Sequence, residues 1–215
     1  MTSTTPQRAR SAEAKHHRER AILEAARTLA ATRSVREVTL TDVAAEVGLH
    51  KSAMLRYFET REQIFLALTA EGWRDWSADV RASWRSAAPE VVLARSLASR
   101  PLFCDLLAQA PLNLERNVSL DAVRDYKRTA LAAVGAVVGD LREAFGLEEE
   151  QAYDVVATAT SMAGALWQMA APGTRLRELY ESEPELSHAI VDVEPRLTRV
   201  LGALIAGFRS QAAAR

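Results

Sequence analysis

The chain has 215 residues, of which 48% are hydrophobic and 26% charged, a composition typical of folded globular proteins and unlike that of disordered ones. No apolar run approaches the ~20 residues that span a bilayer, and residues 1–10 lack the apolar core of a signal peptide. Cys104 is the only cysteine, which excludes an internal disulfide. We therefore expect a cytoplasmic protein that makes no membrane contact.

Charge is divided unevenly along the chain. Residues 1–61 hold 11 Lys and Arg against 7 Asp and Glu, whereas the remainder holds 16 against 21. A basic first part joined to an acidic remainder favours a polyanion-binding module fused to a domain that does not bind nucleic acid. Charge alone does not decide this, because a small excess of cations also arises by chance.

The predicted elements of the first part are all helical. Residues 1–12 are polar and we expect them to form a disordered arm, followed by an amphipathic helix over residues 14–31. Thr39 is a good cap for a short helix that Gly48 can end in the left-handed conformation. Residues 52–58 read as a second short helix, with Met54, Leu55 and Phe58 as its apolar side.

The helical pattern continues to the end of the chain. Thr60 and Gln63 form a capping-box pair for a helix that can run through Trp84 to Pro89. We predict the later helices over residues 89–99, 101–110, 119–145, 148–170 (ended by Pro172-Gly173), 174–180 and 195–208. No segment alternates with a period of two, so no sheet is expected. The prediction is an all-α chain with an arm at 1–12, a DNA-binding domain at 13–70 and a helical effector-binding and dimerisation domain at 71–215.

Two short helices joined by a tight glycine-containing turn form a helix-turn-helix, whose second helix can enter the DNA major groove. The side chains opposite the apolar side of that helix are hydrogen-bond donors and cations, as phosphates and base edges require. They are His50, Lys51, Ser52, Arg56 and Tyr57.

The same stretch resembles the N-terminal signature of the TetR family of transcriptional repressors. The matching residues are Thr39, Asp42, Val43, Ala44, Gly48, Tyr57, Phe58, Arg61 and Glu62. The resemblance covers about residues 15–70. It implies a helix-turn-helix regulator without catalytic activity, cofactor or metal, which binds a palindromic double-stranded operator as a homodimer. It further implies a repressor released by a small-molecule effector, which the apolar composition of the second domain suggests is itself apolar.

The resemblance also assigns DNA contacts by position. Residues expected to face the groove are Thr41, Lys51, Ser52, Ala53 and Arg56. Residues expected at the DNA backbone are Thr39, His50, Tyr57 and Arg61. Two positions depart from the family pattern: Leu55 stands where a tyrosine usually touches a phosphate, and Arg61 replaces a phosphate-binding lysine while keeping its charge.

The second domain offers an effector pocket and a dimer surface without a motif for either. Polar Asn residues and apolar or aromatic side chains of the middle helices are candidates for the pocket, although such stripes also form ordinary cores. They are Phe103, Leu107, Asn113, Asn117, Tyr126, Met162, Leu166, Trp167 and Met169. Small and apolar residues of the last two long helices are candidates for a four-helix dimer interface, or for packing inside the subunit. They are Gly164, Leu197, Leu201, Leu204, Ile205 and Phe208.

Two alternative functions remain at this stage. The pairs Glu13/His16 and Glu185/His188 have the Glu-x-x-His spacing of di-iron carboxylate bundles, but neither pair falls on an apolar stripe, which disfavours such an enzyme. An architectural DNA-binding protein without an effector is the other alternative.

Overall fold

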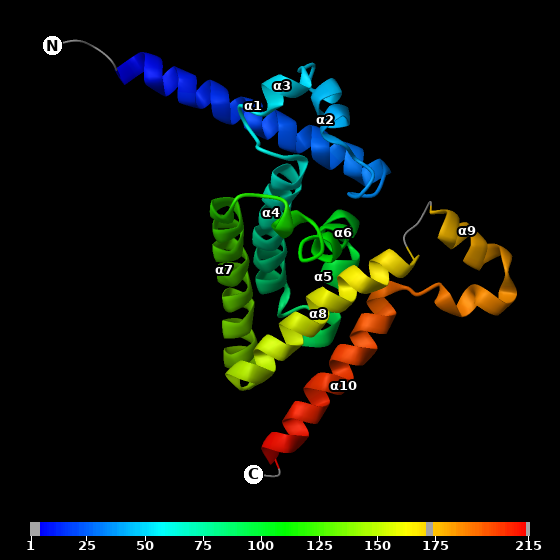
Figure 1. Cartoon of the computed structure of the whole chain (residues 1–215). Coiled ribbons are helices and arrows are strands. Elements are labelled where there is room, and N and C mark those ends of the chain that lie inside the picture. Colours follow the sequence, from blue (N-terminus) through cyan, green and yellow to red (C-terminus); the bar gives the residue numbers. More distant parts are fainter. Residues whose placement is uncertain (1–4, 171–173, 214–215) are drawn as a thin grey trace.

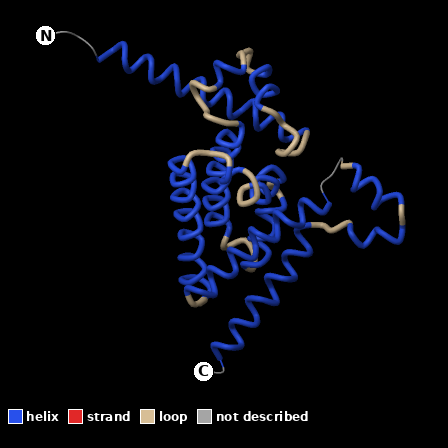
Figure 2. Tube along the Cα trace, in the orientation of Figure 1, coloured by secondary structure: helices blue, strands red, loops and turns tan. Residues whose placement is uncertain are grey.

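The computed structural model describes residues 5–170 and 174–213, and within them the chain is helical without a strand (Figures 1 and 2). The elements are α1 (Thr5–Thr32), α2 (Leu40–Glu46), α3 (Lys51–Met54), α4 (Arg61–Ser83), α5 (Pro89–Ala98), α6 (Pro101–Gln109), the 3-10 helix η1 (Leu114–Arg116), α7 (Leu120–Phe145), α8 (Glu149–Ala170), α9 (Arg175–Ser182), the 3-10 helix η2 (Pro184–Ala189) and α10 (Val193–Ala213). The all-α prediction is confirmed.

The helices form a small head and a larger body (Figure 1). We call α1, α2, α3 and the start of α4 the head. Its core consists of fully buried side chains from all four helices, among them Ile22, Val43, Met54 and Ile64. Helix α4 leaves the head and runs down into the body beside α7, so one continuous helix connects the two parts.

Residues expected to start and end helices do so. Thr39 forms a reciprocal capping box with Asp42 at the start of α2, and Gly48 adopts the left-handed conformation, with φ 66°, that turns the chain toward α3. Thr60 caps α4 by accepting the Gln63 N–H at 3.1 Å. In the body, Gly146 ends α7 with φ 70°.

Two features of the head differ from the sequence prediction. Helix α1 begins at Thr5, so residues 5–12, where a disordered arm was expected, belong to this helix. Helix α3 ends at Met54, and residues 55–57 form a turn. Because the helix stops there, Leu55 does not continue the apolar side with Met54 and Phe58; it is 58% exposed.

The body buries residues that we had assigned to a dimer interface. Leu197, Leu201 and Ile205 are at most 2% exposed, because α10 packs on α5 and α8 of the same chain. Gly164 of α8 faces α6, where an added Cβ would lie 3.0 Å from the Ala108 nitrogen. These four residues therefore hold the subunit together, which corrects their assignment. Leu204 and Phe208 are partly buried against the same core.

Helix α9 and the 3-10 helix η2 pack against each other and project from the side of the body (Figure 1). The Pro172-Gly173 pair that we expected to end α8 lies outside the described residues. Within the described residues, no helix combines the length and apolarity needed to cross a bilayer.

Candidate nucleic-acid interface

The turn between α2 and α3 fixes the angle at which α3 projects from the head. The Leu49 N–H donates to the Ala44 carbonyl at 2.8 Å, and the Gly48 N–H donates to the Ala45 carbonyl at 3.1 Å. These bonds satisfy the last carbonyls of α2 while Gly48 reverses the chain. Met54 is fully buried beneath α3, so the opposite side of this short helix faces outward.

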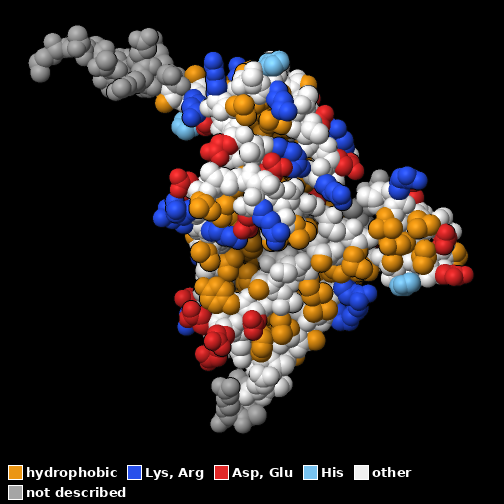
Figure 3. Space-filling view, in the orientation of Figure 1, with side chains coloured by type: hydrophobic (Ala, Val, Ile, Leu, Met, Phe, Trp, Pro, Cys, Tyr) orange, Lys and Arg blue, Asp and Glu red, His pale blue; other side chains and the backbone are white. Residues whose placement is uncertain are grey.

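Lys51 and Arg56 are exposed, and neither forms an ion pair with a carboxylate of the described chain. Unpaired cations on the second helix of a helix-turn-helix, as for Lys51, or directly after it, as for Arg56, are available for phosphates and guanine edges. Thr41 and Ser52 are also exposed, whereas Ala53 is half-buried. In the space-filling view, Lys, Arg and His side chains lie over the head (Figure 3). Four of the five residues expected to face the groove are thus solvent-exposed.

His50 precedes α3 and caps it. Its Nδ1 accepts the Ser52 N–H at 3.3 Å and lies 2.8 Å from the Ser52 hydroxyl oxygen. A ring nitrogen that accepts an N–H carries no proton of its own, so in neutral His50 the proton is on Nε2. The exposed ring can donate that proton outward, which is the polarity a phosphate requires.

Leu55 is solvent-exposed, although helical spacing placed it on the apolar side of the second short helix. It is 58% exposed and lies directly after α3, next to the exposed Arg56. An exposed leucine here can contact a thymine methyl group but offers no hydrogen bond to a phosphate. Tyr57, by contrast, is half-buried against the head core. In the sequence, only the family resemblance indicated that residue 55 is exposed, because family members usually carry a phosphate-contacting tyrosine at the position of Leu55.

Thr39 uses its side chain within the head. Its hydroxyl donates to the Asp42 carboxylate at 2.7 Å and accepts the Asp42 N–H at 3.2 Å. The Thr39 backbone N–H donates to the same carboxylate at 2.8 Å, and together these bonds lower the pKa of Asp42. The capping box therefore orients α2, and any DNA contact by Thr39 is additional to that role.

Arg61 points inward. Its Nε donates to the Val38 carbonyl, one terminal nitrogen donates to the Val35 carbonyl, and the other lies 2.9 Å from Glu62. The guanidinium carbon also lies 4.7 Å from the centre of the Phe65 ring. This geometry gives Arg61 a structural role that the sequence did not predict, namely binding the turn between α1 and α2. Its predicted phosphate contact stays a prediction.

The residues expected in an effector pocket are divided between two cavities, the core of the body and its surface. Asn117 donates to the Asn113 carbonyl at 2.9 Å and to its side-chain oxygen at 2.8 Å, so these amides bind each other in the loop before α7. Met169 is exposed. Phe103 and Tyr126 line two different cavities. Leu107, Met162, Leu166 and Trp167 line neither of these two, and they pack as core or partly buried side chains.

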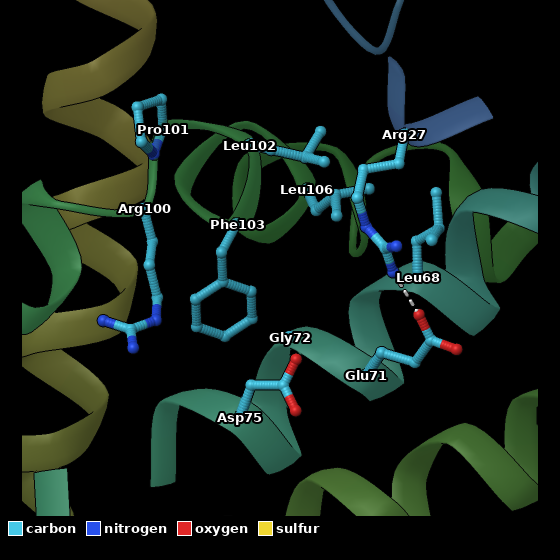
Figure 4. A pocket seen from close by; sticks show the side chains of 10 residues that line it. All are labelled: Arg27, Leu68, Glu71, Gly72, Asp75, Arg100, Pro101, Leu102, Phe103 and Leu106. Carbon is cyan, nitrogen blue, oxygen red and sulfur yellow. Dashed lines mark hydrogen bonds and ion pairs between the residues drawn. The ribbon is translucent and has the colours of Figure 1, made fainter. Parts of the chain in front are cut away.

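A cavity of about 210 Å³ lies where the head meets the body, and we call it the junction cavity (Figure 4). Its walls are mainly apolar, and its rim carries the ion pair between Arg27 of α1 and Glu71 of α4, at 2.6 Å. The lining residues are Arg27, Leu68, Glu71, Gly72, Asp75, Arg100, Pro101, Leu102, Phe103 and Leu106. Helices α1, α4 and α6 thus contribute side chains to one site.

A second cavity of about 370 Å³ lies between α1, α4 and α7 and includes Tyr126. The Tyr126 hydroxyl accepts the Trp73 indole N–H at 3.3 Å, and burial raises the pKa of Tyr126.

No three His, Cys, Asp or Glu side chains converge as a metal site in the part of the chain that the structure describes. His16, which the Glu-x-x-His spacing pairs with Glu13, has its Nδ1 3.1 Å from a carboxylate oxygen of Glu19.

Family models match nearly the whole chain. The model described as "Bacterial regulatory proteins, tetR family" matches residues 22–68, and "Tetracyclin repressor-like, C-terminal domain" matches residues 70–212. The chain belongs to the TetR family. It is therefore a DNA-binding transcriptional regulator of a ligand-responsive family and not an enzyme. The head corresponds to the family's DNA-binding domain and the body to its C-terminal domain.

Solved structures of other regulators align with most of the TetR-family chain. The fatty acid degradation regulator FadR from Bacillus halodurans aligns with a TM-score of 0.59 and 14% identity, covering 89% of this chain and 96% of that one. AmtR of Mycobacterium smegmatis gives 0.45 and 18%, covering 86% and 91%. FadR from Bacillus subtilis in complex with stearoyl-CoA gives 0.47 and 15%, covering 80% and 98%. The first likeness establishes a common fold. Among curated proteins, none matches this chain.

Proposed function

We propose that this TetR-family protein is a homodimeric repressor that leaves a palindromic operator when a small apolar effector fills the junction cavity. The observation that carries the proposal is the path of α4. It begins at Arg61, five residues after Arg56 in the chain, and it forms part of the cavity wall through Leu68, Glu71 and Gly72. A change in the cavity therefore acts on the helix that carries the head.

The size and lining of the junction cavity favour a small effector. A cavity of ~150 Å³ holds benzene, whereas pockets for drug-sized ligands begin at ~300 Å³. At about 210 Å³, the junction cavity suits a molecule with one aromatic ring or a short aliphatic chain. Leu68, Leu102 and Leu106 supply apolar contacts, and the Arg27–Glu71 pair at the rim supplies polar groups for orientation.

The outer faces of α8 and α10 are the proposed dimer surface. Exposed residues recur there at helical spacing, and most of them are small: Tyr153, Ala157, Ser161 and Ala165 on α8, and Arg199, Ala203, Ala206 and Gly207 on α10. Small side chains permit close approach of two helices, and an isologous pairing of these faces would form a four-helix bundle. Dimerisation is needed because two recognition helices must enter the groove ~34–36 Å apart.

The proposal is tested by selecting bound sequences from random DNA. We expect an inverted repeat with half-sites about one helical turn apart. One-ring aromatic compounds that raise the melting temperature are then titrated against the operator complex, and we expect about 5- to 150-fold weaker DNA binding. DNA binding without sequence preference would instead support the architectural alternative. A tight ligand that left operator affinity unchanged would refute the effector role of the cavity.

The dimer surface has its own test. Ala165→Arg places a charge on the outer face of α8, and we expect a monomer in light scattering with normal helicity. Ala132→Arg, on the exposed side of α7, is the matched control and should remain dimeric. A dimeric Ala165→Arg variant would mean that the dimer interface does not include this face of α8.

A further inference from the structure

Asp105 on α6 is the one charged residue among the buried residues of the described chain. It is 4% exposed, and each carboxylate oxygen binds a different part of the molecule. Oδ2 accepts the backbone N–H of Val35 at 2.7 Å, and Oδ1 accepts the side-chain amide of Gln168, on α8, at 2.6 Å. A single carboxylate therefore joins the head to two helices of the body.

Val35 lies in the turn between α1 and α2, which the Glu37 N–H closes by donating to the Ser34 carbonyl at 3.0 Å. The Val35 side chain is fully buried, and its carbonyl accepts from the Arg61 guanidinium. The same residue is thus bound by α6 through its N–H and by the start of α4 through its carbonyl. Because α2 follows this turn directly, the position of the turn sets the position of α2 and α3.

Stability alone does not account for a carboxylate at this place. Burying an ionised group is costly, and apolar residues of similar volume often replace buried charges without loss of stability. A carboxylate with two short hydrogen bonds does fix the positions of its two donors relative to α6, because each donor must lie within about 3 Å of its oxygen. A movement of α6 by ~1 Å would lengthen the bond to Val35 beyond that range.

We propose that Asp105 is a positioning residue for DNA binding: it holds the head in the orientation that fits the operator and passes movements of α6 to the turn at Val35. This rests on the proposed function only in taking the ligand-free form as the one that binds the operator. Helix α6 also forms part of the wall of the junction cavity, because Phe103 and Leu106, which lie close to Asp105 in the sequence, line that cavity. An effector that shifts α6 would therefore displace the acceptor of the Val35 N–H.

Other contacts also join head and body, and α4 runs continuously through both, so loss of Asp105 loosens the head without detaching it. Arg27 pairs with Glu71 at 2.6 Å, and the Thr60 hydroxyl donates to the Asn117 carbonyl at 3.2 Å. Without the bond to Val35, the head spends part of its time in other orientations. The apparent operator affinity then falls by the fraction of time lost from the competent one.

The test compares three variants of the full-length protein. Asp105→Leu removes both bonds, and we expect operator affinity to fall about tenfold or more, as for loss of a hydrogen bond to a charged group. Asp105→Asn keeps an acceptor for Val35 and can donate to the Gln168 oxygen, so it should bind DNA like the wild type. Gln168→Leu removes only the bond within the body and is the matched control, with operator affinity within about twofold of the wild type on the same grounds.

Affinity for random DNA separates positioning from general damage. It depends on phosphate contacts by each head alone, so we expect it to change less than operator affinity in Asp105→Leu. Hydrogen exchange at Val35 should accelerate in this variant and not in Asp105→Asn. Should Asp105→Leu fail to fold, Val35→Pro removes the donor instead, at a turn position that favours proline.

Equal operator affinity in Asp105→Leu and the wild type, or an equal loss in Gln168→Leu, would overturn the positioning role. Lys51→Ala, measured in parallel, keeps this failure distinct from failure of the proposed function. If Lys51→Ala loses operator binding while Asp105→Leu does not, the DNA interface stands and only the role of Asp105 is refuted.

Discussion

The ring of Phe103 on α6 lies directly against the backbone of Gly72 on α4. A Cβ at Gly72 would overlap Cδ2 of the ring and lie 2.9 Å from Cε2. The same ring packs edge-to-face on Trp73, with centroids 5.5 Å apart, and Trp73 packs in the same way on Trp76 at 5.6 Å. Close approach of α6 to α4 at the junction cavity therefore depends on the absence of a side chain at position 72.

Gly72→Ala should destabilise the protein by about 1–3 kcal/mol, the usual cost of overpacking a filled core. The added methyl group must displace the Phe103 ring from the two tryptophans, so tryptophan fluorescence should change as well. The measurement is urea unfolding followed by fluorescence. Gly135→Ala on α7 is the matched control, because nothing lies within 4 Å of the added atom.

The control should have the opposite sign. Alanine is favoured over glycine in a helix by up to ~1 kcal/mol, so Gly135→Ala should stabilise the protein. If Gly72→Ala were as stable as Gly135→Ala, α6 would be able to move away from α4 at little cost. The tight packing at Gly72 would then not restrain α6.

Local signals in the sequence predicted the start and end of α2 and the start of α4. Thr39, Gly48 and Thr60 act through bonds to residues at most a few positions away, so their effect is readable without the fold. Leu55 shows the limit of such signals. Helical spacing placed it with Met54 and Phe58, but α3 ends one residue earlier, and the spacing rule then no longer applies.

Tertiary partners could not be predicted in the same way. Periodicity identified Leu197, Leu201 and Ile205 as one apolar face, but an apolar face packs equally well on a helix of the same chain or of a partner. The inward position of Arg61 depends on the carbonyls of Val35 and Val38, which the fold brings to it. Asp105 carried no sequence signal, because its two donors come from distant parts of the chain.

Lys51→Ala and Arg56→Ala should each weaken operator binding without affecting the fold. Both side chains are exposed, so urea unfolding should be unchanged within ~0.5 kcal/mol. A lost base contact costs ~1–3 kcal/mol and relaxes specificity at one position, whereas a lost phosphate contact lowers affinity for all sequences and reduces the salt slope by ~1. Fluorescence anisotropy over a range of salt concentrations distinguishes the two. Arg85→Ala, exposed on the body, should bind like the wild type; if Lys51→Ala and Arg56→Ala do so too, α3 is not the recognition helix.

Leu55→Tyr should tighten DNA binding. The exposed position after α3 can place a phenol near the phosphates, where leucine has no hydrogen-bond donor. We expect a gain of about 0.5–1.5 kcal/mol, the net value of one hydrogen bond, for operator and random DNA alike. Leu55→Phe is the control, since it supplies the ring without the hydroxyl. An equal gain in both variants would mean that the ring, and not a phosphate bond, is responsible.

The stability of Asp105→Asn should depend on pH differently from that of the wild type. Burial raises the pKa of Asp105 in the folded protein, against the opposing effects of the hydrogen bonds from Val35 and Gln168 and of the Arg61 charge; the nearby Glu37 raises it further. Between the unfolded pKa of ~3.9 and the folded one, the native state binds more protons than the unfolded state. The contribution of Asp105 to stability is therefore greatest at low pH and declines as pH rises through this interval. Asparagine does not titrate, so the stability of the wild type relative to Asp105→Asn should fall in urea unfolding as pH rises above ~4. The control of opposite sign is Asp42→Asn. The bonds from Thr39 lower the pKa of Asp42, so the contribution of Asp42 to stability is lost as pH falls below ~4.

Parallel pH profiles for the wild type and Asp105→Asn would mean that the Asp105 carboxyl does not have the raised pKa that its burial predicts.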